Sequence, residues 1–445
     1  MKEPQAALAD ASRIAAAELA QRFSSIRNTT ESLCRPLTAE DQMVQSMPDC
    51  SPTKWHQAHT TWFFETFILQ PYLSGYQPFD PQFQFVFNSY YKRLGGHPIR
   101  GRRGLFSRPE LERVLAYRRH VDSGMLRFLE QHADFSPDLQ YLIELGLNHE
   151  QQHQELILTD IKHAFWSQPL QPAYKVATDA MQSGSPASPS GRSRAASSEP
   201  EPLRWFEYDE GIYSLGHARS SFAFDNETPH HEVYLRSFQL ASRLVTNGEY
   251  LDFINDHGYR RPELWLSDGW DTVSSQGWSA PLYWEHDEGR WFLYSLAGLR
   301  PLDLSEPACH VSFYEADAFA RWAGARLATE AEWEIAAVSV PVDGNLLEAA
   351  SYHPQPATPS SGTLPSQLFG DVWEWTASAY SPYPGFKPAA GVLGEYNGKF
   401  MCNQIVLRGG SCATPRTHIR ASYRNFFPAH ARWQFSGIRL AKDRP

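Results

Sequence analysis

The chain has 445 residues, of which 42% are hydrophobic and 20% charged, and its formal net charge is -10 at pH 7. This length predicts two domains, and the composition excludes wholesale disorder. The acidic balance without a long basic stripe argues against a nucleic-acid partner, and no apolar run reaches the roughly 18 residues of a membrane span. Five widely spaced cysteines and no recognisable secretory signal predict a reduced, cytoplasmic protein.

The first half of the chain is predicted to be helical. Its stretches with helical apolar spacing or helix-start signals are Ala6–Arg27, Trp55–Leu69, Pro109–Gln131 and Pro137–Phe165. Together they predict an antiparallel four-helix bundle in residues 1–175, and the interior of such a bundle is a usual place for a metal site.

A low-complexity run of Ser, Pro, Ala and Gly follows, so residues 176–203 are predicted to be a flexible linker. Residues 204–445 alternate short β-like runs with loops rich in Gly, Asn and Asp, which predicts a loop-rich α+β domain. The expected strands include Val233–Leu240 and Gln404–Leu407, and the expected helices are Asn247–Asn255, Tyr314–Ala325 and a short one at Thr329–Ala337.

The segment NHEQQHQEL places His149 and His153 four residues apart in a predicted helix, so both rings leave the same face. In an arbitrary H-x-x-x-H the histidines are more often incidental. Here, however, the apolar residues of the helix indicate burial, where unpaired histidines are costly. The pair is therefore a candidate pair of metal ligands.

An earlier predicted helix carries His56 and His59, either of which could complete a three-histidine set. Such a set leaves three positions of an octahedron open, as in non-haem Fe(II) oxygenases, with a histidine in place of the usual carboxylate. Neighbouring polar side chains are expected to hydrogen-bond to the rings and fix their tautomers. These are Glu144, Glu150, Gln152 and Glu155.

The letters from His149 through Glu150 to His153 also match H-E-x-x-H, the zinc peptidase signature. A metzincin would continue with Gly and His where this chain has Leu156 and Thr159. A zinc hydrolase therefore stays an alternative that lacks a clear third ligand. In a third interpretation the histidines are structural and the second half is a non-catalytic binding module.

Two blocks, SPTKWHQAHTTWFFETFIL and HEQQHQEL, resemble the DinB-like N-terminal domain of the ergothioneine-biosynthesis sulfoxide synthases. The motifs TPHHEVYL, VTNGEYLDFI, GDVWEWTAS, VLRGGSCATP and FSGIRLA are similar to the formylglycine-generating-enzyme type of domain, a variant of the C-type lectin fold. The resemblance covers almost the whole chain outside the linker. It implies an α+β multidomain protein with a DinB-like four-helix bundle followed by a C-type-lectin-like domain.

The family resemblance also implies a reaction. It is the Fe(II)- and O2-dependent formation of a C–S bond between a thiol and hercynine, the trimethylammonium betaine of histidine, which gives a sulfoxide. By resemblance the iron ligands are His59, His149 and His153, with His56 as the competitor for the first position. Gln152 is expected to contact the imidazole of hercynine.

In the second domain, the resemblance assigns Asn425 to the carboxylate of hercynine, and Phe426 with Phe427 to the vicinity of its ammonium group. Ordinary core packing is an equally good explanation of the two phenylalanines. Family members that use γ-glutamylcysteine carry charged residues at the positions of Phe427 and Ala431, so the chain is expected to use free cysteine.

The segment NSYYKRLGGHPIRGRRG resembles the cysteine-using subgroup, which has paired tyrosines and arginines near the iron. This resemblance makes Tyr90 and Tyr91 candidates for the proton donor in the reaction with O2, a role that a phenol can take because it is a donor with a pKa near 10. Arg100 and Arg103 are candidates for binding the carboxylate of the amino-acid substrate, with a solvated basic loop as the alternative. Tyr380 is a weaker tyrosine candidate in the second domain.

Selenoneine synthases share this two-domain plan and attach selenium from a selenosugar to the same betaine. The sequence leaves open which of the two donors, cysteine or a selenosugar, the chain uses.

Overall fold

The computed structural model describes residues 3–89, 91, 95–132, 135–175, 202–218, 221–358, 362–388, 394 and 397–444, with side chains from residue 16 onward. The chain divides into two compact units. Unit 1 runs to Ser167, and unit 2 holds most of the remainder. Most of the predicted linker, residues 176–201, lies outside the described residues.

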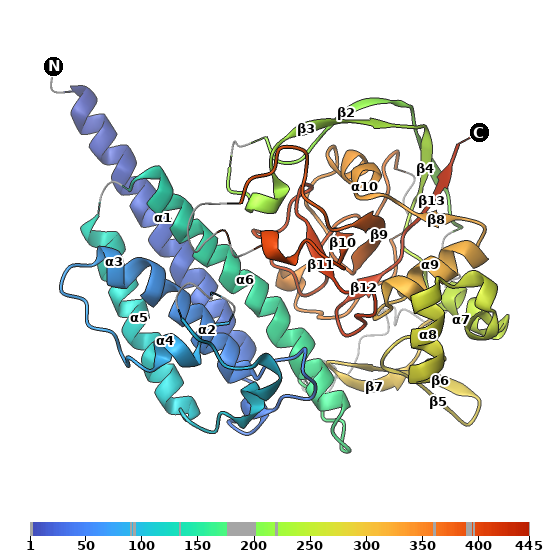
Figure 1. The fold of residues 1–445 in the computed structure, drawn as a ribbon, viewed down its shortest axis with the longest axis horizontal. Helices are drawn as coiled ribbons and strands as arrows, with labels where there is room; N and C mark the ends of the chain where they lie inside the picture. Colours follow the sequence, from blue (N-terminus) through green and yellow to red (C-terminus); the bar gives the residue numbers. More distant parts are fainter. Residues whose placement is uncertain are drawn as a thin grey trace, which may run out of the picture. The chain divides into compact units, whose positions relative to one another are not determined.

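Unit 1 is built from helices that run side by side (Figure 1). The long ones are α1 (Glu3–Cys34), α2 (Thr53–Phe64), α5 (Leu111–Gln131) and α6 (Pro137–Trp166). The shorter ones are a π-helical turn at Glu65–Leu69, α3 (Gln70–Tyr72), α4 (Phe83–Val86) and a 3-10 helix at Arg100–Leu105. Both α1 and α2 pack against α5 and α6, so the interior of the unit lies between these four helices.

The start of α6 and its contact with α2 both follow from the local sequence. Ser136 caps the helix by accepting a hydrogen bond from the backbone N–H of Leu139, and Pro137 occupies the first helical position. One turn before the histidines, a Cβ at Gly146 would lie 2.7 Å from the ring of Phe64 and 2.9 Å from that of Phe63. The glycine therefore lets the two helices approach closely at this level.

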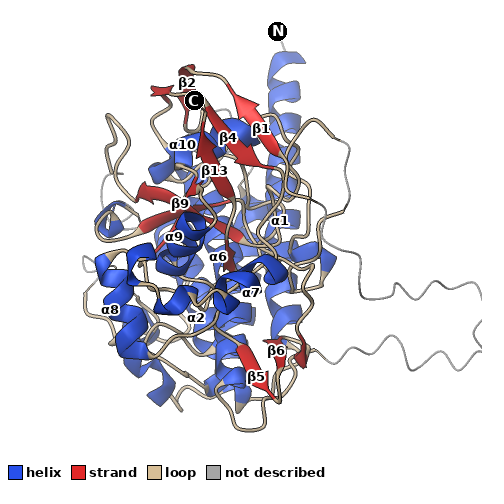
Figure 2. Ribbon diagram, turned by 90° about the vertical axis from the view of Figure 1, so that its right-hand side faces the viewer, coloured by secondary structure: helices blue, strands red, loops and turns tan. Residues whose placement is uncertain are grey.

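Unit 2 combines short strands with helices and long loops (Figure 2). One sheet has the order β1 (Trp205–Tyr208), β4 (Phe238–Ala241), β13 (Leu440–Asp443), β8 (Arg326–Leu327), and a second has the order β11 (Asn425–Phe427), β10 (Ile405–Arg408), β9 (Trp373–Ala379), β12 (Ser436–Gly437). The remaining strands form the hairpin β2 (Gly211–Leu215) and β3 (His231–Leu235), and the antiparallel set β5 (Trp284–Asp287), β6 (Arg290–Ser295) and β7 (Gly298–Pro301). All described pairs are antiparallel except β9 with β12. The helices are α7 (Asn247–Asn255), α8 (Ser267–Gln276), α9 (Phe313–Trp322) and α10 (Glu330–Ala337).

Two sequence predictions in this unit need correction. The predicted strand Val233–Leu240 is two strands, β3 and β4, which pair in different sheets. Helix α8 was not predicted, because SDGWDTVSSQ is poor in strong helix-forming residues. Its end is nevertheless marked by Gly277, whose φ of 65° is the left-handed conformation usual after a helix.

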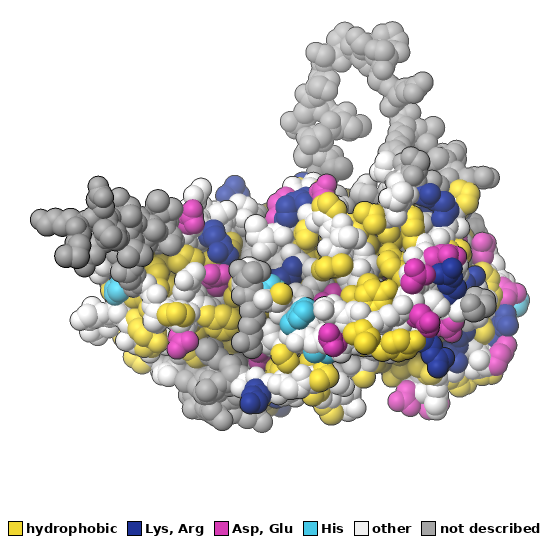
Figure 3. Space-filling view, turned by 90° about the horizontal axis from the view of Figure 1, so that it is seen from above, with side chains coloured by type: hydrophobic (Ala, Val, Ile, Leu, Met, Phe, Trp, Pro, Cys, Tyr) yellow, Lys and Arg dark blue, Asp and Glu magenta, His cyan; other side chains and the backbone are white. Residues whose placement is uncertain are grey.

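On the face shown in Figure 3, the Lys and Arg side chains lie in small groups among acidic and hydrophobic ones. None of the described helices combines the length and the apolar character needed to cross a membrane.

Candidate metal centre

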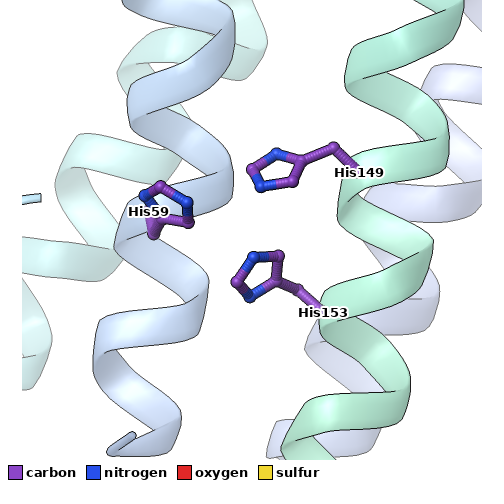
Figure 4. A group of neighbouring side chains, drawn as sticks. All are labelled: His59, His149 and His153. Carbon is purple, nitrogen blue, oxygen red and sulfur yellow. The ribbon is translucent and has the colours of Figure 1, made fainter. Parts of the chain in front are cut away.

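Three buried histidines converge between α2 and α6. His59 comes from α2, while His149 and His153 come from successive turns of α6, and the rings point toward one another (Figure 4). One ring nitrogen from each residue lies within 4.8 Å of the other two. The structure thus brings together the three predicted ligands, and within its described part no carboxylate or thiol joins the group.

The three imidazoles are held in the neutral form. Burial lowers the pKa of His149 to about 3, and burial likewise lowers the pKa of His59 and His153 well below the usual 6.5. A neutral imidazole keeps a lone pair on one ring nitrogen, which a metal ion requires. The donor set therefore fits a cation at neutral pH.

The orientation of His59 is determined by its neighbours. Its Nδ1 lies 2.6 Å from the carbonyl oxygen of Phe87. Because a carbonyl only accepts, Nδ1 carries the proton and Nε2 keeps the lone pair. The rings of Trp55 and Trp62 stack on the His59 ring at centroid distances of 4.5 and 5.5 Å, which restricts its rotation.

His56, the competitor for the first ligand position, uses both nitrogens elsewhere. Its Nδ1 lies 2.8 Å from Nδ1 of His153, and its Nε2 lies 3.0 Å from Oδ2 of Asp160. Sequence reasoning did not identify Asp160 as a partner, since the contact forms between two helices about a hundred residues apart.

The prediction that Glu150 hydrogen-bonds to the histidine rings is wrong. Its carboxylate is fully buried and accepts hydrogen bonds of 2.7 Å from Arg27, Arg118 and Thr30 on the neighbouring helices. Burial raises the pKa of Glu150, but the two guanidinium groups outweigh it and bring the pKa to about 2. Glu150 therefore forms an ion-pair network that joins α6 to α1 and α5.

Tyr90 lies outside the described residues, whereas Tyr91 is fully buried. The ring of Tyr91 packs against Trp62 at 5.6 Å and against Phe67 at 5.3 Å. Since Trp62 also stacks on His59, a single aromatic residue separates Tyr91 from the histidine cluster.

Arg103 is the buried arginine of the basic loop. Its guanidinium carbon lies 3.4 Å from the ring centroid of Trp55, and it donates hydrogen bonds of 2.9 Å to the hydroxyls of Ser51 and Ser89. Burial, together with the charge of Arg100, lowers the pKa of Arg103 to about 9. The guanidinium group of Arg103 therefore lies on Trp55, the residue that stacks on His59, and its hydrogen-bond partners are hydroxyl groups.

The other two predicted residues of unit 1 are less enclosed. Arg100 is exposed and donates a hydrogen bond to the backbone carbonyl of Asp49. Gln152 is half-buried on α6, directly before His153.

The predicted residues of unit 2 are Tyr380, Asn425, Phe426 and Phe427, the last three of which form β11. The buried Tyr380 ring stacks on Phe426 at 4.0 Å, and its hydroxyl accepts a hydrogen bond from Asn226. The side-chain oxygen of Asn425 accepts from the backbone N–H of Phe426. Phe427 packs edge-on against Trp433. Phe426 and Phe427 are half-buried and make separate aromatic contacts, as expected for successive residues of a strand.

Residues 208–444 match the family model of the sulfatase-modifying factor enzyme 1-like domain, which is more than half of the chain. The chain belongs to this family. The sulfatase-modifying factor enzyme 1-like domain includes β2 to β13 and α7 to α10, and its presence confirms the type of domain predicted for the second half.

Parts of the chain are also similar to characterised proteins. It is 37% identical over 242 residues to a hercynine oxygenase of Mycobacterium tuberculosis, a match that covers 50% of this chain and 56% of that protein. It is 28% identical over 235 residues to ergothioneine biosynthesis protein 1 of Schizosaccharomyces pombe, covering 50% of this chain and 28% of that protein. A formylglycine-generating enzyme of Streptomyces coelicolor is 29% identical over 254 residues, 45% of this chain and 76% of that enzyme. The chain thus spans about half the length of the hercynine oxygenases that it matches.

Proposed function

We propose that this protein is a mononuclear non-haem iron(II) enzyme of ergothioneine biosynthesis. In this proposal it joins hercynine to cysteine by a C–S bond, with O2 as the oxidant, and forms a sulfoxide. The observation that carries the proposal is the convergence of three neutral imidazoles, His59, His149 and His153, with no carboxylate from the described residues in the group. The partial similarity to hercynine oxygenases supports hercynine as the substrate.

The donor set fits an iron ion. Imidazole nitrogen is a good ligand for iron, zinc and copper, and a set of three protein ligands leaves coordination positions for exogenous molecules. An Fe(II) ion held by the three histidines would supply one-electron chemistry with O2 and a binding position for a thiolate. Three neutral ligands also avoid placing excess negative charge next to an anionic thiolate.

Several side chains of unit 1 would act on the substrates. Among the described residues, Tyr91 is the proposed proton donor, because it is buried against Trp62, which stacks on His59. Tyr90 remains a second candidate. Arg103 is proposed to bind the carboxylate of cysteine, because a buried guanidinium with two hydroxyl partners can gain a charged acceptor there. Arg100 could assist from the exposed side of the same loop.

Other roles in the proposal come from resemblance. Gln152 is assigned to the imidazole of hercynine, Asn425 to its carboxylate, and Phe426 to its trimethylammonium group. Phe427 and the fully buried Ala431 carry no charge with which to bind a glutamyl group, which favours free cysteine over γ-glutamylcysteine.

The geometry argues against the zinc hydrolase. In an H-E-x-x-H peptidase the glutamate is the general base and must reach the metal-bound water. Glu150 instead binds Arg27 and Arg118 with its two carboxylate oxygens. It is therefore committed to the ion-pair network.

A product assay by mass tests the proposed function. The protein is loaded with Fe(II) without oxygen and is then given O2, hercynine and, in separate reactions, cysteine, γ-glutamylcysteine or a selenosugar. We expect O2 consumption and a sulfoxide from cysteine. A product from the selenosugar alone would show that the second substrate is a selenium donor and not cysteine. Peptide cleavage by the zinc form without O2 consumption would overturn the proposal.

A matched pair of variants belongs with this assay. His149→Ala removes a proposed ligand, whereas His163→Ala removes a histidine of the same helix whose Nδ1 hydrogen-bonds to Ser46. Only the first should abolish product formation. For the proton donor, Tyr91→Phe is expected to lower the ratio of sulfoxide to simple cysteine oxidation products, and Tyr90→Phe and Tyr380→Phe are the comparison variants.

A further inference from the structure

A chain of three buried side chains leads away from the histidine cluster. Oδ2 of Asp160 lies 3.0 Å from Nε2 of His56, and Nδ1 of His56 lies 2.8 Å from Nδ1 of His153. The exposed fractions are 4%, 2% and 8% for Asp160, His56 and His153, so water does not compete well for these contacts. The backbone N–H of Ser51, just before α2, donates to the same Asp160 oxygen at 2.7 Å.

We propose that His56 and Asp160 are positioning residues of the metal centre, which hold the His153 ring with its Nδ1 proton toward His56 and its Nε2 lone pair toward the ion. The inference rests on the proposed function, because it requires a metal ion at the histidine cluster. It concerns residues that do not themselves touch the ion.

The order of the protons follows from the chemistry of each group. Nδ1 of His153 is committed to His56, so a metal ion must take Nε2, and Nε2 must then be free of its proton. Nδ1 of His153 is therefore the donor to His56, and Nδ1 of His56 is the acceptor. A neutral His56 then carries its proton on Nε2 and donates it to the Asp160 carboxylate. With the ion on Nε2 of His153 and a neutral His56, this arrangement satisfies both hydrogen bonds of the chain.

His59 reaches the same tautomer by a different device. The carbonyl oxygen of Phe87 accepts its Nδ1 proton, so Nε2 faces the cluster here too. The carbonyl belongs to the backbone and cannot change its role, whereas an imidazole such as His56 can donate or accept. An ionised Asp160 carboxylate can only accept a hydrogen bond, so it holds the His56 proton on Nε2 and leaves Nδ1 of His56 as the acceptor for His153.

The rival explanation is that His56 simply ties α2 to α6 through Asp160. Two substitutions separate the explanations. His56→Leu removes both hydrogen bonds with little change in volume. His56→Asn also loses the reach to Asp160, but its side-chain carbonyl lies near the position of Nδ1 and can still accept the His153 proton. A structural tie predicts equal effects of the two variants, whereas the positioning role predicts unequal ones.

The test is the affinity of the metal-free full-length protein for Co(II), measured by chelator competition and by the visible absorption of the bound ion. We expect His56→Leu to weaken Co(II) binding by about 10- to 100-fold, the usual effect of removing an outer-shell partner. His56→Asn should stay within about threefold of wild type, because the acceptor for His153 is kept. His163→Leu, on α6 with His153, is the control and should bind Co(II) as wild type does.

Each outcome decides the question. Equal affinity of His56→Leu and wild type would overturn the inference, as would an equal loss in His56→Leu and His56→Asn. If wild type binds no Co(II), or if His149→Ala binds as tightly as wild type, the metal centre itself fails, and with it the proposed function. The melting temperature of each metal-free variant shows whether a loss of affinity arises from unfolding.

Discussion

The two units each contain a prominent group of buried ionisable side chains, and the two groups differ in kind. In unit 2, buried charges occur as pairs of opposite sign: Arg439 donates to Glu374, with both side chains 1% exposed, while Arg408 and Arg424 share Glu330. In unit 1, three histidines made neutral by burial direct their rings to one point. The ion pairs of unit 2 neutralise their own charges. The three histidines of unit 1 instead offer neutral nitrogen ligands that suit a cation.

Unit 1 also shows the difference within a single helix. His149 joins the cluster, and the next residue, Glu150, belongs to a self-complementary network with Arg27 and Arg118. Adjacent residues of a helix point about 100° apart, so one turn of α6 can serve the proposed site on one face and the packing of the bundle on another. Burial alone therefore does not mark a functional residue; the chemistry of its partners does.

The largest expected effect is the loss of metal binding when the cluster is broken. Replacing His59, His149 or His153 by Ala should reduce the iron content of the purified protein to background, because two imidazoles do not complete the site. Elemental analysis of the full-length variants measures this. Iron retained by all three variants would show that the convergence of these rings is not a metal site.

Breaking a pair in unit 2 should change stability and leave metal binding intact. Arg439→Met leaves the Glu374 carboxylate buried without its cation, which is expected to lower the free energy of unfolding by about 3–5 kcal/mol. Arg261→Met, at an exposed pair with Asp256, is the control and should change the free energy of unfolding far less, because water screens an exposed pair. Urea unfolding compares them, and similar small costs would contradict a structural role of the buried pair.

Glu150→Gln tests whether the ion-pair network of unit 1 acts independently of the adjacent histidine cluster. The substitution removes the carboxylate that Arg27 and Arg118 share and leaves them only Asp122 and Glu31, respectively, so the free energy of unfolding should fall by up to about 3 kcal/mol. The iron-loaded protein that remains folded should turn over at nearly the wild-type rate. A stable variant that has lost turnover would instead contradict the purely structural role of Glu150.

The smallest effect is a pH dependence in unit 2. Burial, followed by the charge of Arg420, lowers the pKa of His418 well below its usual 6.5. Below pH 6.5 the unfolded chain therefore binds a proton that the folded chain does not, and the free energy of unfolding decreases as the pH falls, by at most about 1.4 kcal/mol per pH unit. His418→Gln should flatten this slope in urea unfolding between pH 6.5 and 5.5; an unchanged slope would contradict it.

Much of the secondary structure was predictable because it depends on local signals. Thr246, Ser312 and Thr329 cap α7, α9 and α10, and each begins a capping box that can be read from the sequence. The long helix α6 was predicted to within one residue from its Ser-Pro start and its apolar spacing. Helix α8 was missed because its residues favour a helix only weakly, and its packing in unit 2 decides its conformation.

The sequence by itself determined that His149 and His153 share a face of one helix, since that follows from a spacing of four residues. It also determined the family of the second half, which the match over residues 208–444 confirms. Only the tertiary structure decided that His59 joins the cluster while His56 bonds to Asp160 and His153, and that Glu150 turns to Arg27. These partners lie on different helices, and contacts between helices depend on packing geometry that no local pattern contains.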